Sequence, residues 1–487
     1  MRTILSLHVG IHSLPVGLGL KRCGLDVAAI IAPKNAVEFY RKELASELKD
    51  TLVIDREYAR LAHYQEVGHA EVGWSLVGDP RFVAGLAMLD RVNWNSANFP
   101  DLYRLYTRHL EWARKLVRDV NAEVCWFDGI PHQAHDWALY QACVESGVEI
   151  LMPRYVVFDY SKTLHTRLDG DPICVGSFVP GAFVSGYSHS DYLAENIPFQ
   201  VSTKESHKQR GLSQIFSAMS LETLRSKFRI FREVRFAYTS MVPSWRHFEI
   251  TKDLVRVRDR YRHSRISKWL LELPKELDVG DREIAFFPLH FQPEANSLPG
   301  GFAHFDQISA IRALASRLPD NMLLVVKEHP QMLKWRPQWA RARSAQFYEE
   351  FLSIPKVKFV SPEFASAEIV ERAVLVATLT GTAGFEARLK GKTTLVFGSA
   401  WYGGMRGVHR ARTIADIDRA IEAGLSGADT ALAPEEIRVF QEQYTMVGFG
   451  KNIPRPDGEP DDFWALKYAS GLASVIQKLK VDASASA

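Results

Sequence analysis

Lys327-Glu328-His329-Pro330 follow an apolar run, Leu323 to Val326, that predicts a buried strand. Proline cannot continue a β-ladder, so we expect the strand to end here and to present His329 at the turn. A lysine and a histidine at the carboxyl end of a strand suit a phosphate that gains charge as a leaving group departs. Taken alone, the same residues also fit a strand-ending turn with solvated charges.

A loop of small residues, Thr380-Gly381-Thr382-Ala383-Gly384, follows a second apolar run and leads into a predicted helix. Hydroxyl groups and backbone N–H groups at a helix N-terminus can bind an anion, and each charge there gains roughly 0.3–1 kcal/mol. An ordinary glycine-containing turn with a threonine cap is the alternative. The loop lacks the lysine pattern of a P-loop, so a triphosphate site is not predicted.

A third loop, Phe287 to Ala295, contains Gln292-Pro293 and again follows an apolar run. Ligands of open parallel sheets bind outside the carboxyl ends of the strands. Three such loops at one predicted sheet edge are hard to explain as unrelated turns, and together they predict a ligand site.

In the first half of the chain, Asp128-Gly129 follows the apolar stretch 122–127. A carboxylate there could act as a general base or as a nucleophile at an anomeric carbon. Asp-Gly is also a common turn pair. His132 and His135 lie close by, but no further ligands occur at zinc spacing, so no metal site is predicted. We interpret both histidines as turn, capping or acceptor-contacting residues.

The elements that would position these residues alternate between strand and helix, which predicts an α/β protein with parallel sheets. The predicted strands cover 3–9, 26–32, 52–55, 122–127, the neighbourhood of Ile150, 283–287, 322–326, 357–360, 374–379 and 394–397. The predicted helices between them cover 135–146, 305–317, 345–354, 364–372 and 383–390. This order fits two doubly wound, Rossmann-type domains that face each other across a cleft, the arrangement called GT-B.

We predict an acceptor-side domain over 1–200, a basic helical junction over 201–278 and a nucleotide-sugar-binding domain over 279–460. A final helix over 463–479 and a flexible tail would fill 461–487. Residues 201–270 hold 16 Lys and Arg against 6 Asp and Glu. Each such cation gains about 1 kcal/mol at most near an anionic leaflet, so this stretch suits either a membrane surface or a solvated face with internal ion pairs.

The composition of the 487 residues, 46 % hydrophobic and 24 % charged, is typical of a soluble globular protein. A net charge of +3 gives no reason to expect nucleic-acid binding. The four cysteines show no paired spacing, no signal peptide is recognisable, and no apolar run is long enough to span a membrane. These features predict a cytoplasmic protein, and the basic stretch allows peripheral binding to the inner face of the membrane.

Gln292-Pro293, His329-Pro330 and Thr380-Gly381-Thr382 with Gly384 to Ala387 together resemble the capsule polysaccharide biosynthesis family. Thr394 to Gly398 and Trp401 to Gly403 extend the resemblance, which covers about 283–404. That family includes retaining β-Kdo glycosyltransferases of GT-B fold, which transfer Kdo from CMP-Kdo to a lipid-linked or polysaccharide acceptor.

The resemblance implies that Asp128 attacks the anomeric carbon, and that the acceptor hydroxyl then displaces the covalent intermediate with net retention. A general-base role for Asp128 would instead give inversion. It also implies a site that needs no metal and no cofactor, with His329 at the leaving phosphate. The other implied donor contacts are Gln292, Lys327, Pro330, Glu363, Thr380, Gly381 and Thr382, with Glu363 at the cytidine ribose. Gly129, His132 and His135 would support the loop or contact the acceptor.

The expected partners are a nucleotide sugar and a glycan or glycolipid acceptor, and the basic stretch leaves an anionic membrane surface open as a third. Two other classes of function stay open. One is a transferase that uses another CMP-nonulosonic acid or a CDP-polyol donor, and the other is a non-catalytic glycan-assembly protein.

Overall fold

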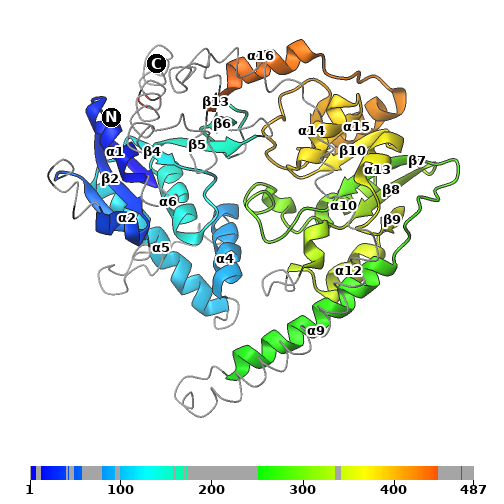
Figure 1. Cartoon of the computed structure of the whole chain (residues 1–487), viewed down its shortest axis with the longest axis horizontal. Coiled ribbons are helices and arrows are strands. Elements are labelled where there is room, and N and C mark those ends of the chain that lie inside the picture. The colour runs from blue at the N-terminus through cyan, green and yellow to red at the C-terminus, as the bar shows by residue number, and fades with distance from the viewer. Residues whose placement is uncertain are drawn as a thin grey trace, which may run out of the picture. The chain divides into compact units, whose positions relative to one another are not determined.

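The computed structural model describes residues 2–6, 13–39, 42, 46, 49–56, 79–93, 99–156, 161–168, 170–173, 250–334, 342–447, 473 and 476. These residues build two sheets flanked by helices (Figure 1). The predicted α/β class with Rossmann-type parallel sheets is therefore confirmed.

The first sheet has the strand order β13-β6-β5-β4-β1-β2-β3. Its parallel part consists of β1 (Arg2–Ser6), β2 (Asp26–Ala32), β3 (Leu52–Asp55), β4 (Val124–Phe127) and β5 (Glu149–Tyr155). β6 (Ser161–His165) pairs antiparallel with β5, and β13 (Thr445–Val447) pairs antiparallel with β6. The sheet is thus parallel over five strands and carries two antiparallel strands at one edge.

The helices that connect the strands of this sheet are α1 (Ser13–Arg22), α2 (Lys34–Phe39), α4 (Pro80–Asn93), α5 (Phe99–Asp119) and α6 (Ala134–Glu145). α6 is buried over most of its length, since Ala134 to Cys143 are all shielded from solvent. α5 instead buries one stripe, as expected for a helix with one apolar face. α4 and α5 are not among the predicted elements.

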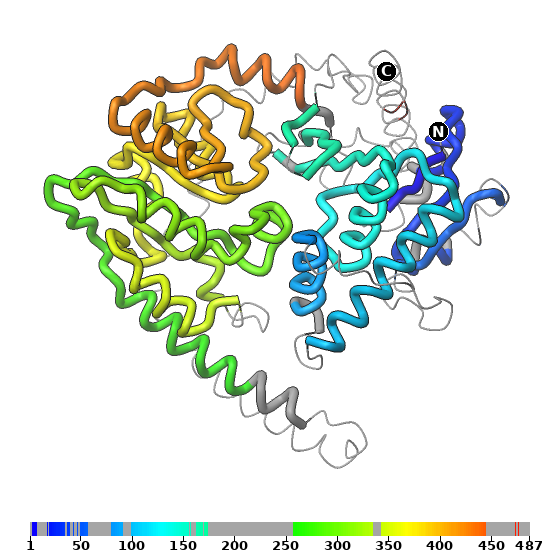
Figure 2. The backbone as a smooth tube through the Cα atoms, turned by 180° about the vertical axis from the view of Figure 1, so that it is seen from behind, coloured from blue at the N-terminus to red at the C-terminus, as the bar shows by residue number. Residues whose placement is uncertain are grey.

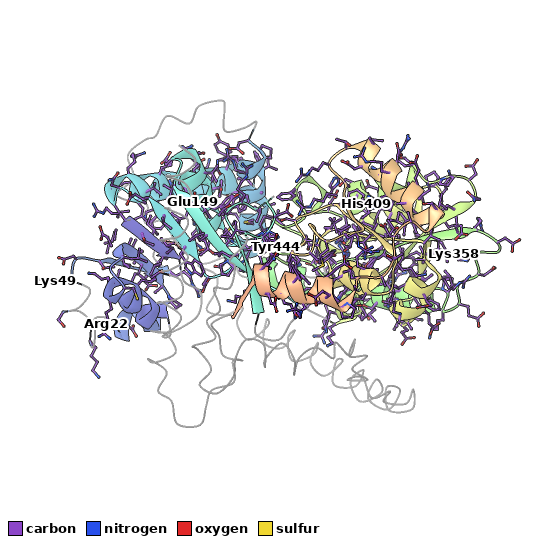
Figure 3. The ribbon with its side chains drawn as sticks, turned by 90° about the horizontal axis from the view of Figure 1, so that it is seen from above. Arg22, Lys49, Glu149, Lys358, His409 and Tyr444 are labelled. Carbon is purple, nitrogen blue, oxygen red and sulfur yellow. The ribbon has the colours of Figure 1, made fainter. Side chains whose placement is uncertain are left out.

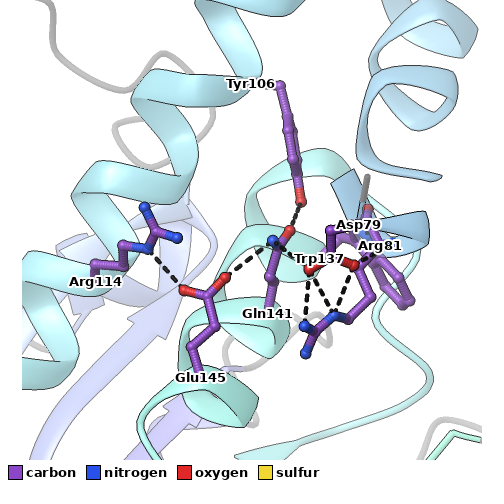
Figure 4. A network of polar contacts seen from close by, with 7 residues as sticks. All are labelled: Asp79, Arg81, Tyr106, Arg114, Trp137, Gln141 and Glu145. Atoms are coloured by element: carbon purple, nitrogen blue, oxygen red, sulfur yellow. Dashed lines mark hydrogen bonds and ion pairs between the residues drawn. The ribbon is translucent and has the colours of Figure 1, made fainter. Parts of the chain in front are cut away.

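A network of polar contacts joins α4, α5 and α6 around the fully buried Gln141 (Figure 4). Its amide oxygen accepts from the Tyr106 hydroxyl at 3.0 Å. Its amide nitrogen donates to Glu145 Oε1 at 3.1 Å and to Asp79 Oδ2 at 3.4 Å. Asp79 in turn pairs with Arg81. Both ends of the Gln141 amide are therefore satisfied inside the protein, which makes its burial tolerable.

The second sheet has the order β12-β11-β10-β7-β8-β9. Its strands are β7 (Glu283–Pro288), β8 (Met322–Lys327), β9 (Val357–Val360), β10 (Leu375–Thr378), β11 (Thr393–Val396) and β12 (Val408–Arg410). β7 pairs in parallel with β8 and β10, and β8 with β9. The edge strands are marked in Figure 3 by Lys358 on β9 and His409 on β12.

The helices of this half are α9 (Ile250–Glu272), α10 (Ile308–Ala315), α12 (Ala345–Leu352), α13 (Ser366–Arg372), α14 (Thr382–Leu389), α15 (Ile414–Ser426) and α16 (Pro434–Tyr444). Two short 3₁₀ helices, η5 (Phe302–His304) and η6 (Pro330–Leu333), lie in the segments that follow β7 and β8. The predicted strand–helix alternation over 283–397 is confirmed.

α9 lies beside α12 (Figures 1 and 2). The Trp269 ring on α9 lies 5.3 Å from the Tyr348 ring on α12 and 5.9 Å from the Phe359 ring on β9. This helix confirms the helical character of the basic stretch over 250–272, while 201–249 lie outside the described residues. The predicted helix over 463–479 also lies outside them, apart from Ala473 and Ile476.

By compactness the chain divides into two units, Met1–Asn196 with Ala295–Ala310 and Thr378–Ala487, and Ile197–Glu294 with Ile311–Ala377. This division does not follow the sheets. β10 falls almost entirely in the second unit and β11 in the first, although the two strands are neighbours in one sheet. The predicted domain boundaries and the predicted cleft between the two domains stay predictions.

Candidate functional site

Lys327 is the last residue of β8 and pairs in register with Pro288 of β7 and Val360 of β9. Its ammonium group is buried and donates to the Phe364 carbonyl at 2.6 Å and to Ser366 Oγ at 2.7 Å. Burial lowers its pKa to about 8. Lys327 thus ties β8 to the segment before α13, and its predicted contact with a donor phosphate stays a prediction.

His329 caps the short helix η6, in which Pro330 is the first residue. Its Nδ1 accepts from the Gln331 backbone N–H at 3.2 Å. Burial lowers the pKa of His329, and the charge of Glu328 offsets this only in part. A ring nitrogen that accepts a hydrogen bond carries no proton, so the neutral ring holds its proton on Nε2. His329 is therefore preset as a hydrogen-bond donor through Nε2, beside the Phe291 ring at 5.8 Å.

Glu328 is fully buried between Lys327 and His329. Its Oε1 accepts from the His329 backbone N–H at 2.7 Å. Its Oε2 accepts from Arg343 Nε and from the Tyr348 hydroxyl, both at 2.8 Å. A buried carboxylate needs such partners to offset the loss of water, and Glu328 has one cation and two neutral donors.

Arg343 is 2 % exposed and joins this carboxylate to the loop after β7. Its Nη2 donates to the His290 carbonyl at 2.8 Å, and its Nη1 to Gln292 Oε1 at 3.1 Å. No role for Arg343 is predicted from the sequence. A single arginine in a polar segment gives no pattern, and its partners lie up to 53 residues away.

The Thr380 loop starts where β10 ends, and β7 lies between β10 and β8 in the sheet. The carboxyl ends of these three strands therefore share one sheet edge, as predicted. The Thr380 hydroxyl donates to the Asn296 carbonyl at 2.9 Å, and the Gly381 N–H donates to Thr378 Oγ1 at 3.2 Å. α14 begins at Thr382 with Gly381 as its N-cap and no side-chain cap, so a threonine cap on this helix is wrong.

Tyr402 stabilises this loop, since its hydroxyl donates to the Gly381 carbonyl. Only glycine fits at position 384, because an added Cβ would lie 2.3 Å from the Tyr402 hydroxyl oxygen. Glu386 lies one turn along α14; burial raises its pKa, and a hydrogen bond with Thr382 opposes this. The N-terminus of α14 is thus held rigidly at the sheet edge.

Glu363 follows β9 and forms an ion pair with Lys275 at 2.6 Å, with both side chains exposed to solvent by a third or more. Its backbone N–H donates to Ser361 Oγ at 3.3 Å. No contact places it in the Glu328–Arg343 network among the described residues, and its predicted contact with a ribose stays a prediction.

Asp128 follows β4 directly, as predicted, and its backbone N–H donates to the Ser6 carbonyl of β1 at 3.1 Å. Its carboxylate lies close enough to Lys162 of β6 to influence that side chain. Burial lowers the pKa of Lys162 to about 8, and Asp128 raises it in opposition. Lys162 is a second group that is not predicted from the sequence, because a lysine in a short strand is ordinarily exposed to solvent.

The two histidines near Asp128 differ in their surroundings. His132 is half-buried, with Nδ1 2.8 Å from the Ile130 carbonyl oxygen, which fits the predicted turn role. His135 is buried at the start of α6, 3.0 Å from Asp136, whose carboxylate also accepts from Ser6 Oγ. Within the described ranges no cluster of three or more His, Cys, Asp or Glu could hold a metal ion.

Comparison with known proteins gives one family match. A family model described as "Capsule polysaccharide biosynthesis protein" matches residues 303–438. This confirms the resemblance over a segment that contains His329, Glu363 and the Thr380 loop and spans less than a third of the chain. No curated protein matches the sequence significantly.

Among solved structures, the β-Kdo 2,4 transferase of Thermosulfurimonas dismutans KpsC is 17 % identical, with 33 % of this chain and 55 % of that chain covered and a TM-score of 0.22. This chain therefore spans about half the length of that structure. The β-Kdo 2,7 transferase of the same protein is 11 % identical over 69 % of this chain and 86 % of that chain, with a TM-score of 0.26. UDP-GlcNAc 2-epimerase from Methanocaldococcus jannaschii is 10 % identical over 90 % and 98 %, also with a TM-score of 0.26. Likenesses this distant bear on neither substrate nor mechanism.

In the part of the chain that the structure describes, no helix is both long and apolar enough to cross a membrane.

Proposed function

We propose that this protein is a glycosyltransferase of capsule polysaccharide synthesis that takes Kdo, or a related ulosonic acid, from a CMP-activated donor. The observation that carries the proposal is the shared carboxyl edge of β7, β8 and β10. There Gln292, His329 and the N-terminus of α14 gather in and around the segment that matches the family model. The acceptor would be a surface polysaccharide or a lipid-linked glycan.

His329 would donate a hydrogen bond through Nε2 to the departing phosphate of the donor. The cap bond to Gln331 supports this role because it directs the proton to Nε2, and the lowered pKa keeps the ring neutral. A CMP leaving group carries one phosphate, so a neutral donor together with a helix N-terminus can stabilise it. The reaction would then need no metal ion.

Asp128 would act as the nucleophile at the anomeric carbon. The carboxylate oxygen bonds to that carbon while the CMP phosphate leaves, and the acceptor hydroxyl then displaces the carboxylate after losing its proton. The nearby Lys162 supports this role, because its positive charge attracts the Asp128 carboxylate. Two displacements give net retention, whereas Asp128 acting as a base would give inversion.

A thermal-shift screen with CMP, CDP, UDP and GDP and their sugars tests the nucleotide. We expect stabilisation by CMP and CMP-Kdo and none by the uridine and guanosine nucleotides. Stronger stabilisation by CDP would favour a CDP-polyol donor, and the absence of any nucleotide effect would favour a non-catalytic glycan-assembly protein. Activity lost to EDTA and restored by Mg²⁺ would contradict the metal-free mechanism.

A matched pair of substitutions separates the two nitrogens of His329. In His329→Asn the amide oxygen can replace Nδ1 as the cap acceptor, but the Nε2 donor is lost. In His329→Gln the amide nitrogen can replace Nε2, while the cap is lost. We expect His329→Asn to lower kcat by about 100-fold, the usual loss when one transition-state donor is removed, and His329→Gln to retain the larger share of activity. The reverse order would refute the Nε2 assignment.

Intact-mass spectrometry tests the covalent step. After incubation with CMP-Kdo and no acceptor, we expect the wild-type mass to increase by one sugar residue and Asp128→Asn to show no adduct. Turnover by wild type with no adduct under rapid quenching would favour the general-base route.

A further inference from the structure

Arg343 and Glu328 form a buried pair that bridges two loops at the carboxyl edge of the second sheet. Glu328 follows β8 and holds the backbone N–H of His329. Arg343 precedes α12 and holds the loop after β7 through the His290 carbonyl and the Gln292 side chain. The ion pair between them, at 2.8 Å with both side chains shielded from solvent, closes the bridge.

The geometry of Arg343 suits this bridging role better than a role in ligand binding. All three guanidinium nitrogens donate to protein acceptors: Nε to Glu328, Nη1 to Gln292 and Nη2 to the His290 carbonyl. The carbon of the guanidinium lies 4.4 Å from the centre of the Phe347 ring, which covers it from one side. Its planar fork thereby fixes three acceptors in one plane, which a lysine cannot do.

The pair also sets how Gln292 is presented. Since Arg343 carries only donors, the Gln292 amide must turn its oxygen toward Arg343 and its nitrogen away. On the other loop, the Glu328 carboxylate fixes the start of η6 and with it the His329 ring. One buried pair therefore orients the two side chains that the proposed function assigns to the donor.

We propose that Arg343, acting through Glu328, is a positioning residue for donor binding and turnover, although it does not touch the donor. This inference rests on the proposed function, because it takes Gln292 and His329 as donor contacts. A misplacement of about 1 Å at a reacting group can cost about 100-fold in rate. Loosening the bridge should therefore lower activity well beyond any loss of folded protein.

Arg388 provides a matched control for substitution of Arg343. It is also fully buried, on α14, and it donates to three backbone carbonyls, those of Arg406, Lys392 and Thr430. Among the described residues it thus fastens the chain without a hydrogen bond to any candidate site residue. Arg343→Lys and Arg388→Lys make the same chemical change at similar burial, so both will lose some stability and differ in what else they lose.

The test combines steady-state kinetics with histidine NMR on the full chain. We expect Arg343→Lys to lower kcat/KM for CMP-Kdo by about 10- to 100-fold, by the same misplacement argument, and Arg388→Lys to stay within about twofold of wild type. If the two variants lose activity in parallel with their stability, the positioning role is refuted. A double-mutant cycle adds a second criterion: Arg343→Lys should have a smaller effect in a His329→Asn background than in wild type, because only the orientation of Gln292 is then left to lose.

The NMR measurement separates this inference from the proposed function. In ¹⁵N-histidine spectra, with the His329 signals identified by their loss in His329→Asn, we expect Arg343→Lys to shift the Nδ1 and Nε2 resonances and Arg388→Lys to leave them in place. This result would support the bridge even if CMP-Kdo proved not to be the donor. Unchanged His329 resonances in Arg343→Lys would overturn it whatever the donor is.

Discussion

Two buried polar networks in this protein look alike in burial and differ in what they connect. The Gln141 network joins α4, α5 and α6, and these helices also pack through apolar contacts such as that of the Phe82 and Tyr106 rings, 5.2 Å apart. The Glu328–Arg343 network joins the loops that follow β7 and β8 to the start of α12. Burial alone therefore does not distinguish the network to which we assign a function from the structural one. The two networks differ in the elements that they connect, which are strand-end loops in the first and packed helices in the second.

The charge content of the two networks differs as well. Gln141 is a neutral amide whose two ends are bonded to a tyrosine and to carboxylates. Glu328 and Arg343 are opposite charges, both hidden from water. Removing one member of a buried pair leaves the other charge uncompensated, which costs more than losing a neutral hydrogen bond.

The largest effect is therefore expected for Glu328→Gln. It leaves the Arg343 guanidinium buried without its carboxylate, so the free energy of unfolding should fall by about 3–5 kcal/mol, and donor binding should be lost. Urea denaturation followed by circular dichroism measures the first effect. Tyr348→Phe is the control, because it removes only one neutral donor to the same carboxylate and should cost about 1 kcal/mol. Equal losses in the two variants would contradict the charged-pair account.

A smaller and purely structural effect is expected for Gln141→Leu. It removes an amide from between Tyr106 and the Asp79 and Glu145 carboxylates, so about 1–3 kcal/mol of stability should be lost. Turnover per folded molecule should not change. A fall in kcat/KM at full folding would show that the two networks are not functionally distinct.

The pH dependence of stability provides a third contrast. Burial near Arg343 and His329 lowers the pKa of His290 to about 3, against about 6.5 in the unfolded chain. Above pH 6.5 neither state binds a proton here, so His290 costs nothing. As the pH falls below 6.5, His290 binds a proton in the unfolded chain but not in the native protein. The free energy of unfolding should therefore drop by at most about 1.4 kcal/mol per pH unit down to about pH 3.

The comparison of wild type with His290→Gln isolates this effect, because the other histidines are the same in both proteins. We expect the two stability profiles between pH 7 and pH 4.5 to diverge, with the wild type falling more steeply. Parallel profiles would mean that the native protein binds a proton at His290 as readily as the unfolded chain does.

The sequence predicts some of these features and not others for identifiable reasons. β2, β3 and β9 have the predicted bounds, because runs rich in apolar residues with polar or turn residues beside them indicate a strand. β6, β12 and β13 are not predicted. All three are short, and β6 and β12 carry Lys162, His165 or His409 within the strand. Their place in the sheet is set by pairing with strands distant in sequence, which no local pattern contains.

The candidate site divides in the same way. Lys327, His329 and the Thr380 loop are predicted because each follows an apolar run that must end at the sheet edge. Arg343 and Lys162 are not, because their importance comes from partners far away in the chain, such as His290 for Arg343. The apolar runs predict which loops lie at one sheet edge, whereas the residues that orient those loops can be identified only from the structure.

The smallest effect on stability is expected at Gly129, next to Asp128. Apart from its two chain neighbours, no atom of the described residues lies within 4 Å of a Cβ added there, whereas one added at Gly85 on α4 would lie 2.0 Å from the Tyr106 ring. Gly85→Ala should therefore cost about 1–3 kcal/mol through overpacking, and Gly129→Ala should cost nothing and can gain up to about 1 kcal/mol by restricting the unfolded chain. Because the open space at Gly129 adjoins the proposed nucleophile, we expect Gly129→Ala to raise the acceptor KM a few-fold at unchanged stability. An unaltered KM would remove Gly129 from the acceptor side of the site and leave it as part of the turn that carries Asp128.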